Sequence, residues 1–248
     1  FNQKLIGLPN SLKVLTIKSE KFNQKLNHLP PNITKLIIYC DEFNRKLNHL
    51  PNQLKTLIMY CHYFNRPLDK LPNNLLHLEM HCHKFNHPLD QLPENLNFLD
   101  FGCNNFSHEF DSLPSSLQKL KINNHNFREL NKLPDTLESL EIYNYHFNGN
   151  VDNLPTNLKT LKLGCSLFNH PINNLPTNLE TLNLCHCKVF NYPLDNLPKS
   201  LLHLYMTDCF NFNYSLDNLP NLLSFSIYYS YKLAYPLTKL PTTLTDLK

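Results

Sequence analysis

The stretch FNRKLNHLPNQLKTLIMYCHY, Phe43 to Tyr63, decides the fold, because near copies of it fill the whole chain. Its Leu50-Pro51 pair recurs twelve times at a step of 21 residues, with one step of 20 and two later steps of 22. A fixed period of this size is typical of a solenoid, in which each repeat packs only against its neighbours. The sequence therefore predicts a long surface rather than a single enclosed pocket.

Each repeat also carries one short alternating apolar pattern, Leu57-x-Met59 in this copy. Side chains of a strand alternate between two faces, so this pattern indicates one strand with one buried face. A proline in every repeat lacks an N–H and disfavours a regular helix in the rest of the unit. We expect a leucine-rich-repeat-like solenoid with one short parallel β-strand per 21–22-residue unit, a concave parallel sheet and an irregular convex side with little helix.

The repeats cover residues 1–248, which we interpret as a single solenoid domain of about eleven units plus a partial last unit. The chain begins on Phe1 without Met and ends inside a unit at Lys248, so we expect it to be a fragment of a longer chain. The formal charge of +3 is too small to indicate nucleic-acid binding. No apolar stretch reaches the roughly 18 residues that cross a membrane, so we expect neither nucleic acid nor membrane among the partners.

A phenylalanine followed by asparagine opens most units. We expect these Asn side chains to be buried and to bond the backbone of the neighbouring turn as a structural ladder; a binding role is the alternative. The ladder comprises Asn23, Asn44, Asn65, Asn86, Asn148, Asn169, Asn191 and Asn213.

Seven of the eight cysteines share one position, three residues before the next Phe: Cys40, Cys61, Cys82, Cys103, Cys165, Cys187 and Cys209. We expect reduced thiols that pack inside the turns as a second structural ladder. A disulfide framework and a zinc site are the alternatives. Stacked neighbours have parallel Cβ vectors that suit a disulfide poorly, and no Cys-x-x-Cys pair is present for zinc. We therefore predict no metal and no cofactor.

Outward strand positions should line the concave face, where Ile37, Tyr39, Ile58 and Tyr60 form a two-by-two apolar block. Exposed apolar and aromatic area marks an interaction site, although sheets favour Ile and Tyr in any case. We predict partner binding by this block together with His77, Glu79, Phe98, Asp100 and Lys121. No acid, base and nucleophile converge anywhere in the pattern, so we predict that the protein is not an enzyme.

The units Phe1 to Ile17 and Phe168 to Leu184 resemble the FNIP repeat, a divergent leucine-rich repeat of social amoebae and large DNA viruses. The resemblance implies a leucine-rich-repeat solenoid for protein–protein recognition. We expect an intracellular, most simply cytoplasmic, location, since no signal peptide is visible and glycans at the sequons of Asn105 and Asn213 would conflict with packing. In that family the repeats are often joined to an F-box, which would make the chain the substrate-recognition arm of a ubiquitin ligase; no F-box-like segment lies in these residues. The alternative hypothesis is a structural or assembly protein, such as a virion component or a homodimer formed through faces or end strands.

Overall fold

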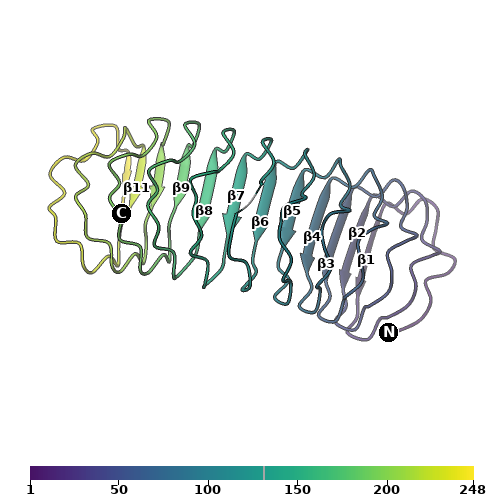
Figure 1. The fold of residues 1–248 in the computed structure, drawn as a ribbon. Coiled ribbons are helices and arrows are strands. Elements are labelled where there is room, and N and C mark those ends of the chain that lie inside the picture. The colour runs from purple at the N-terminus through teal and green to yellow at the C-terminus, as the bar shows by residue number, and fades with distance from the viewer. Residues whose placement is uncertain (131) are drawn as a thin grey trace. The chain divides into compact units, whose positions relative to one another are not determined.

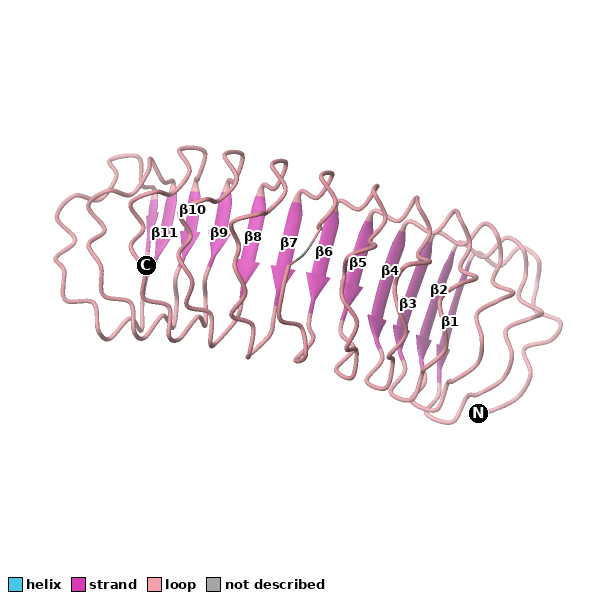
Figure 2. Cartoon of the chain, in the orientation of Figure 1, coloured by secondary structure: helices cyan, strands magenta, loops and turns pink. Residues whose placement is uncertain are grey.

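The computed structural model describes residues 1–130 and 132–248 and confirms the predicted parallel β-solenoid. Each repeat contributes one strand, and the described residues contain no helix (Figures 1 and 2). The chain divides into two compact units, residues 1–126 and 127–248. Whether the whole chain acts as one domain stays a prediction.

The strands of each unit pair in parallel, in the order in which they follow one another in the chain. The first unit holds β1 (Val14–Lys18), β2 (Lys35–Tyr39), β3 (Thr56–Tyr60), β4 (His77–His81), β5 (Phe98–Phe101) and β6 (Lys119–Ile122). The second unit holds β7 (Ser139–Ile142), β8 (Thr160–Leu163), β9 (Thr181–Asn183), β10 (His203–Tyr205), β11 (Ser224–Ser226) and β12 (Asp246–Leu247). Equivalent residues of successive repeats stand side by side, as Leu36 does beside Leu57.

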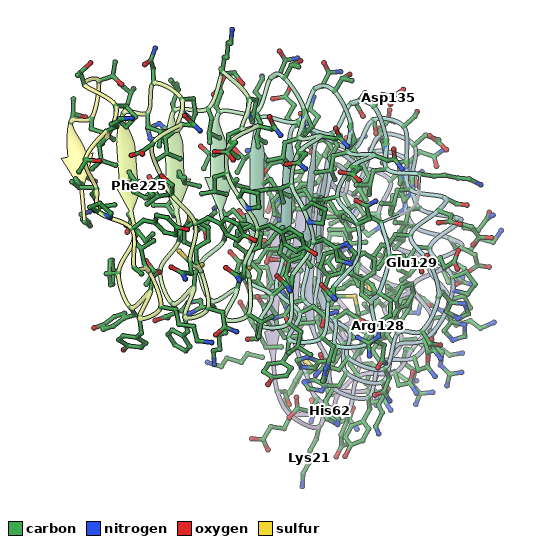
Figure 3. The ribbon with its side chains drawn as sticks, turned by 60° about the vertical axis from the view of Figure 1, so that its left-hand side comes forward. Lys21, His62, Arg128, Glu129, Asp135 and Phe225 are labelled. Atoms are coloured by element: carbon green, nitrogen blue, oxygen red, sulfur yellow. The ribbon has the colours of Figure 1, made fainter. Side chains whose placement is uncertain are left out.

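The core of each unit is built from the inward strand positions and from the phenylalanine of the Phe-Asn pair. Leu57 and Met59 are fully buried, as the alternating pattern predicts. Phe43 and Phe64 are buried across from the strands, and their nearly parallel rings lie 6.1 Å apart. In the second unit Phe225 is equally buried, whereas Lys21 of the first unit stands out into solvent (Figure 3).

The spacing of the phenylalanine rings shows how the coils of the first unit are stacked. Successive rings are 6.0 to 6.1 Å apart from Phe1 through Phe85. Paired strands lie only about 4.8 Å apart. The coils therefore spread on the phenylalanine side, which places the sheet on the inner, concave side of this unit.

The Leu-Pro pair ends the convex segment of each repeat with a tight turn. The carbonyl of Pro51 accepts a hydrogen bond from the N–H of Leu54 at 3.0 Å, and the same bond joins Pro72 to Leu75. Proline has no N–H to donate and holds φ near the value that such a turn needs. The repeated proline thus returns the chain to the next strand at the same point in every coil.

Candidate functional site

The outward strand positions of the first unit form three rows on the concave face, because the strands pair without any slip in register. The first row contains Lys35, Thr56, His77, Phe98 and Lys119. The second row contains Ile37, Ile58, Glu79, Asp100 and Lys121. The third row contains Tyr39, Tyr60 and His81. All the residues predicted to bind a partner belong to these rows, so the structure brings them together on one face.

Three rings of the third row are stacked on one another. The ring centroids of Tyr39 and Tyr60 are 5.1 Å apart, and those of Tyr60 and His81 are 4.6 Å apart. Tyr39 is 41% exposed and Tyr60 is 38% exposed. Burial, followed by the charges of Glu79 and Asp100, raises the pKa of Tyr60, so its hydroxyl is a neutral hydrogen-bonding group at physiological pH. We call Tyr39, Tyr60 and His81 the Tyr–His stack.

A glycine directly after the neighbouring strand β5 makes room for the last ring of the stack. A Cβ atom on Gly102 would lie 2.3 Å from Nδ1 of His81, a distance at which one of the two groups must shift. Gly164 stands in the same relation to Tyr143 in the second unit, where the Cβ would lie 2.7 Å from the ring. Glycine therefore lets a ring of the preceding coil lie flat over the next strand.

The expectation that Asp100 is exposed to a partner is corrected by the structure. The residue is only 7% exposed and offers little surface to a partner. Its carboxylate lies 3.2 Å from Nζ of Lys121 and 3.4 Å from Nε2 of His81. Burial alone would raise the pKa of Asp100, but His81 and Lys121 outweigh that effect and hold the pKa below its ordinary value. Asp100 thus fixes its neighbours instead of contacting solvent.

The first and second rows hold a further pair of interacting side chains. Nε2 of His77 lies 2.7 Å from Oε1 of Glu79, within hydrogen-bond distance. The His77 ring also lies flat against Phe98 at a centroid distance of 4.1 Å. Ile37 and Ile58 are half-buried beside them. The face therefore combines fixed rings, aliphatic area and a few charges, without an enclosed cavity.

The asparagine ladder differs from the expectation in its burial. The N–H of Asn44 donates to Oδ1 of Asn23 at 3.1 Å, and the N–H of Asn65 donates to Oδ1 of Asn44 at the same distance. The same bond recurs in both units at 2.8 to 3.1 Å. The side chains are exposed or half-buried, so the prediction that they are buried is wrong. Phe43 is buried, whereas Asn44 directly after it reaches the surface.

The seven cysteines of the shared position are all buried, with free thiols. Sγ of Cys40 donates to the carbonyl of Ile17 at 3.5 Å, and Sγ of Cys165 donates to that of Ile142 at 3.4 Å. Burial raises the pKa of Cys40 to about 11 and that of Cys165 to about 12. These thiols are therefore protonated and shielded at neutral pH.

Two buried asparagines at the cysteine position are structural residues that the sequence reasoning did not single out. Nδ2 of Asn144 donates to the carbonyl of Phe127 at 2.7 Å, while its Oδ1 accepts the N–H of His146 at 2.7 Å. Asn124 likewise accepts the N–H of Asn126 at 2.8 Å and donates to the carbonyl of Phe106. The sequence does contain a sign of this role. Both asparagines stand at the position that cysteine holds in other repeats, three residues before the next Phe.

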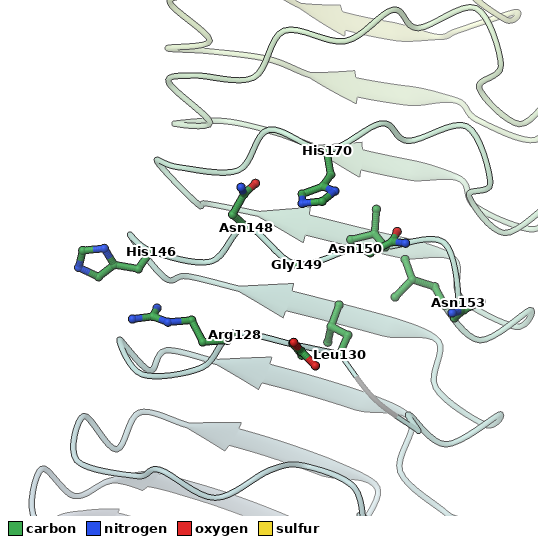
Figure 4. A pocket seen from close by; sticks show the side chains of 11 residues that line it. Arg128, Leu130, His146, Asn148, Gly149, Asn150, Asn153 and His170 are labelled. Carbon is green, nitrogen blue, oxygen red and sulfur yellow. The ribbon is translucent and has the colours of Figure 1, made fainter.

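The second unit contains a polar cavity of about 460 Å³ on its convex side (Figure 4). Arg128, His146, Asn148 and His170 are among the side chains that line it. Only Asn148 belongs to the predicted site residues.

Within the described ranges, no three His, Cys, Asp or Glu side chains are placed to hold a metal ion, and no helix is long and apolar enough to cross a membrane.

A known family model matches part of the chain. The FNIP repeat model matches residues 1–41, 22–62 and 85–125. A search of curated proteins finds no match to this chain.

Two solved structures resemble the fold. The chain is 28% identical to CroV588, a circular leucine-rich-repeat protein of a giant virus, with a TM-score of 0.73. The match covers all of this chain and 45% of that one, so this chain spans less than half the length of CroV588. The functional domain of InlJ from Listeria monocytogenes, described as including a cysteine ladder, is 14% identical with a TM-score of 0.55. That match covers 96% of this chain and 58% of the chain of that domain, and it shows the fold alone.

Proposed function

Because this chain carries FNIP repeats and folds as a leucine-rich-repeat-like solenoid, we propose that it is a non-catalytic recognition protein that binds a protein partner on its concave sheet. Folds of this kind typically serve protein–protein interaction. The binding residues would be those of the three rows in the first unit, centred on the Tyr–His stack.

The observation that carries this proposal is the exposed, pre-ordered stack of Tyr39, Tyr60 and His81. Tyrosine is enriched among the residues that dominate binding energy, since a rigid ring buries a large area at a small cost in conformational entropy. Stacking holds these rings in place before a partner arrives. Tyr39 and Tyr60 also line an open hollow of about 540 Å³ together with Lys18 and Asp41. An open hollow beside fixed rings suits a side chain of a protein partner, whereas a small molecule is usually enclosed.

The neighbouring groups supply a rim around the rings. Ile37 and Ile58 add half-buried aliphatic area, while His77, Glu79 and Lys121 provide hydrogen-bonding and charged groups at its border. An apolar centre with a polar border is the usual anatomy of a protein interface. Asp100 contributes indirectly, because it holds His81 and Lys121 in place.

The proposal has two finer aspects. A role as the substrate-recognition arm of an F-box ubiquitin ligase rests on family analogy alone. An intracellular, cytoplasmic location is supported by the buried, reduced cysteines, since secreted proteins usually oxidise theirs.

The test replaces Tyr39 and Tyr60 with alanine and compares the proteins captured from a native cell extract with those captured by the unchanged chain. We expect at least one captured protein to be lost from the variant, since ring anchors commonly contribute about 2 kcal/mol or more. The matched control is Thr160→Ala with Thr181→Ala. These two threonines are paired outward residues on β8 and β9 of the second unit. A folded variant that retains every captured protein would overturn the proposal.

A further inference from the structure

The first coils of the chain carry a concentration of positive charge that the net charge of the chain conceals. Residues 1–66 contain ten Lys and Arg against three Asp and Glu, a net charge of +7, whereas residues 67–248 contain thirteen against seventeen, a net charge of −4. Five of these cations, Lys4, Lys25, Arg45, Lys46 and Arg66, line two adjoining hollows. We call these five residues and their hollows the basic groove.

The basic groove has no acidic neighbours among the described residues. The two hollows measure about 320 and 420 Å³, and no Asp or Glu lines either of them. None of the five cations lies within ion-pair distance of a carboxylate in the described part of the chain. The charges are therefore left for a ligand, and such a cluster attracts anions from solution.

The two arginines of the groove are held in position by the preceding coil. Nε of Arg45 donates to the carbonyl of Asn23 at 2.8 Å, and Nε of Arg66 donates to the carbonyl of Asn44 at 3.2 Å. These bonds use the inner nitrogen of each guanidinium and leave its two terminal NH₂ groups as donors. A guanidinium fixed in this way binds a carboxylate at a smaller entropic cost than a mobile lysine does.

The step between coils on this side matches the repeat of an extended peptide. Successive coils are 6.0 to 6.1 Å apart at the phenylalanine rings that lie beneath the groove. Alternate side chains of an extended strand, which point the same way, lie about 6.6 Å apart. A peptide that runs along the groove would thus present one side chain to each coil.

We propose that the basic groove binds an extended acidic segment of a protein, with a carboxylate at every second residue and one carboxylate per coil. The side-chain amides of Asn27, Asn44 and Asn48 also line the groove and can bond the backbone of such a peptide. This site is separate from the Tyr–His stack on the concave face and does not depend on it.

Two other polyanions fit the groove less well. Sequence-tolerant binding of single-stranded nucleic acid relies on large aromatic side chains on which bases stack. The rings of His28 and His49 line the two hollows, but neither Phe nor Tyr does. An anionic lipid surface is flat and favours protruding cations, whereas these cations line hollows. Both remain outcomes of the test.

The test measures binding of the 248-residue chain to dye-labelled peptides by fluorescence anisotropy at low salt. The first peptide alternates Glu and Ser over twelve residues, and the second holds six Glu followed by six Ser. We expect the alternating peptide to bind more tightly. Arg45→Glu with Arg66→Glu should weaken its binding by about tenfold or more, because each change removes a charge-assisted contact and adds repulsion.

The matched control is Lys13→Glu with Lys55→Glu, which changes the net charge equally at two exposed lysines outside both hollows. This control should lose much less affinity, and Tyr39→Ala with Tyr60→Ala should lose none. Equal losses in the groove and control variants would mean that net charge alone attracts the peptide and would overturn the proposal. So would equal affinity for the two peptides, no binding at all, or tighter binding of a single-stranded oligonucleotide or of phosphatidylserine vesicles. Melting curves check that each variant is folded.

Discussion

The imidazole of His81 occupies the space where a side chain at position 102 would begin, since a Cβ atom on Gly102 would lie 2.3 Å from Nδ1 of His81. This relationship connects backbone composition to the concave face, because His81 ends the stack that starts at Tyr39. The ring also lies 3.4 Å from the carboxylate of Asp100. One hydrogen atom in place of a methyl group thus decides where the last ring of the stack lies.

Gly102→Ala should therefore displace His81 from the stack without unfolding the solenoid. The added methyl forces the ring out of its present rotamer, which costs on the order of 1 kcal/mol. Thermal unfolding should show a small decrease in stability, and the NMR signals of the His81 ring should lose the shift caused by Tyr60. Unchanged His81 signals in the variant would contradict this account of Gly102.

The buried and exposed asparagines should respond differently to truncation. Asn144→Ala removes the hydrogen bonds of this buried side chain to the carbonyl of Phe127 and to the N–H of His146, which should cost about 1–3 kcal/mol of unfolding free energy. Asn86→Ala should cost less than about 1 kcal/mol, because Asn86 is exposed and water can replace its bond to Ser107. Urea unfolding measures both, and a larger loss for Asn86→Ala would reverse the assignment.

The thiols should react with Ellman's reagent in two classes. Cys185 lies outside the shared cysteine position and is only half-buried, whereas the other seven cysteines are buried. In the native protein at pH 8 we expect one fast thiol, since the reactive species is the exposed thiolate. Cys185→Ser should abolish the fast phase, and denaturation should release all eight thiols. Several fast thiols in the native protein would show that the shared position is open to solvent.

The raised thiol pKa values also predict a loss of stability at alkaline pH. Burial raises the pKa of Cys40 to about 11 and the pKa of Cys209 to about 12, against an ordinary value of 9.0. The folded protein then keeps protons that the unfolded chain has lost, so these thiols reduce the free energy of unfolding as pH rises above 9 toward 12. The control replaces Cys40 and Cys209 with Ser, because Ser19 and Ser230 occupy the equivalent position of their repeats. This variant should lose less stability between pH 8 and 10.5. Equal losses in the two proteins would contradict the linkage.

The sequence was sufficient to predict the strands, because Leu57 and Met59 repeat at a fixed period and alternation leaves one arrangement that buries both. The outward position of Asn44 does not follow from this alternation, because Phe43 and Asn44 lie between β2 and β3 and not in a strand. The burial of Asp100 was not predictable, since it depends on His81 and Lys121 from the coils on either side. The basic groove was missed because the net charge of the chain averages Arg45 and Arg66 with acidic residues far away in sequence.

The most direct measurement of the central claim, recognition through the concave face, places a photo-crosslinking phenylalanine analogue at Tyr60 and irradiates the protein in native cell extract. We predict one discrete covalent adduct that disappears when Tyr39 is also changed to alanine, because both rings belong to the same stack. The analogue at exposed Leu167, in a turn of the second unit, serves as the control and should give no such adduct. An adduct from position 167 and none from position 60 would contradict the claim.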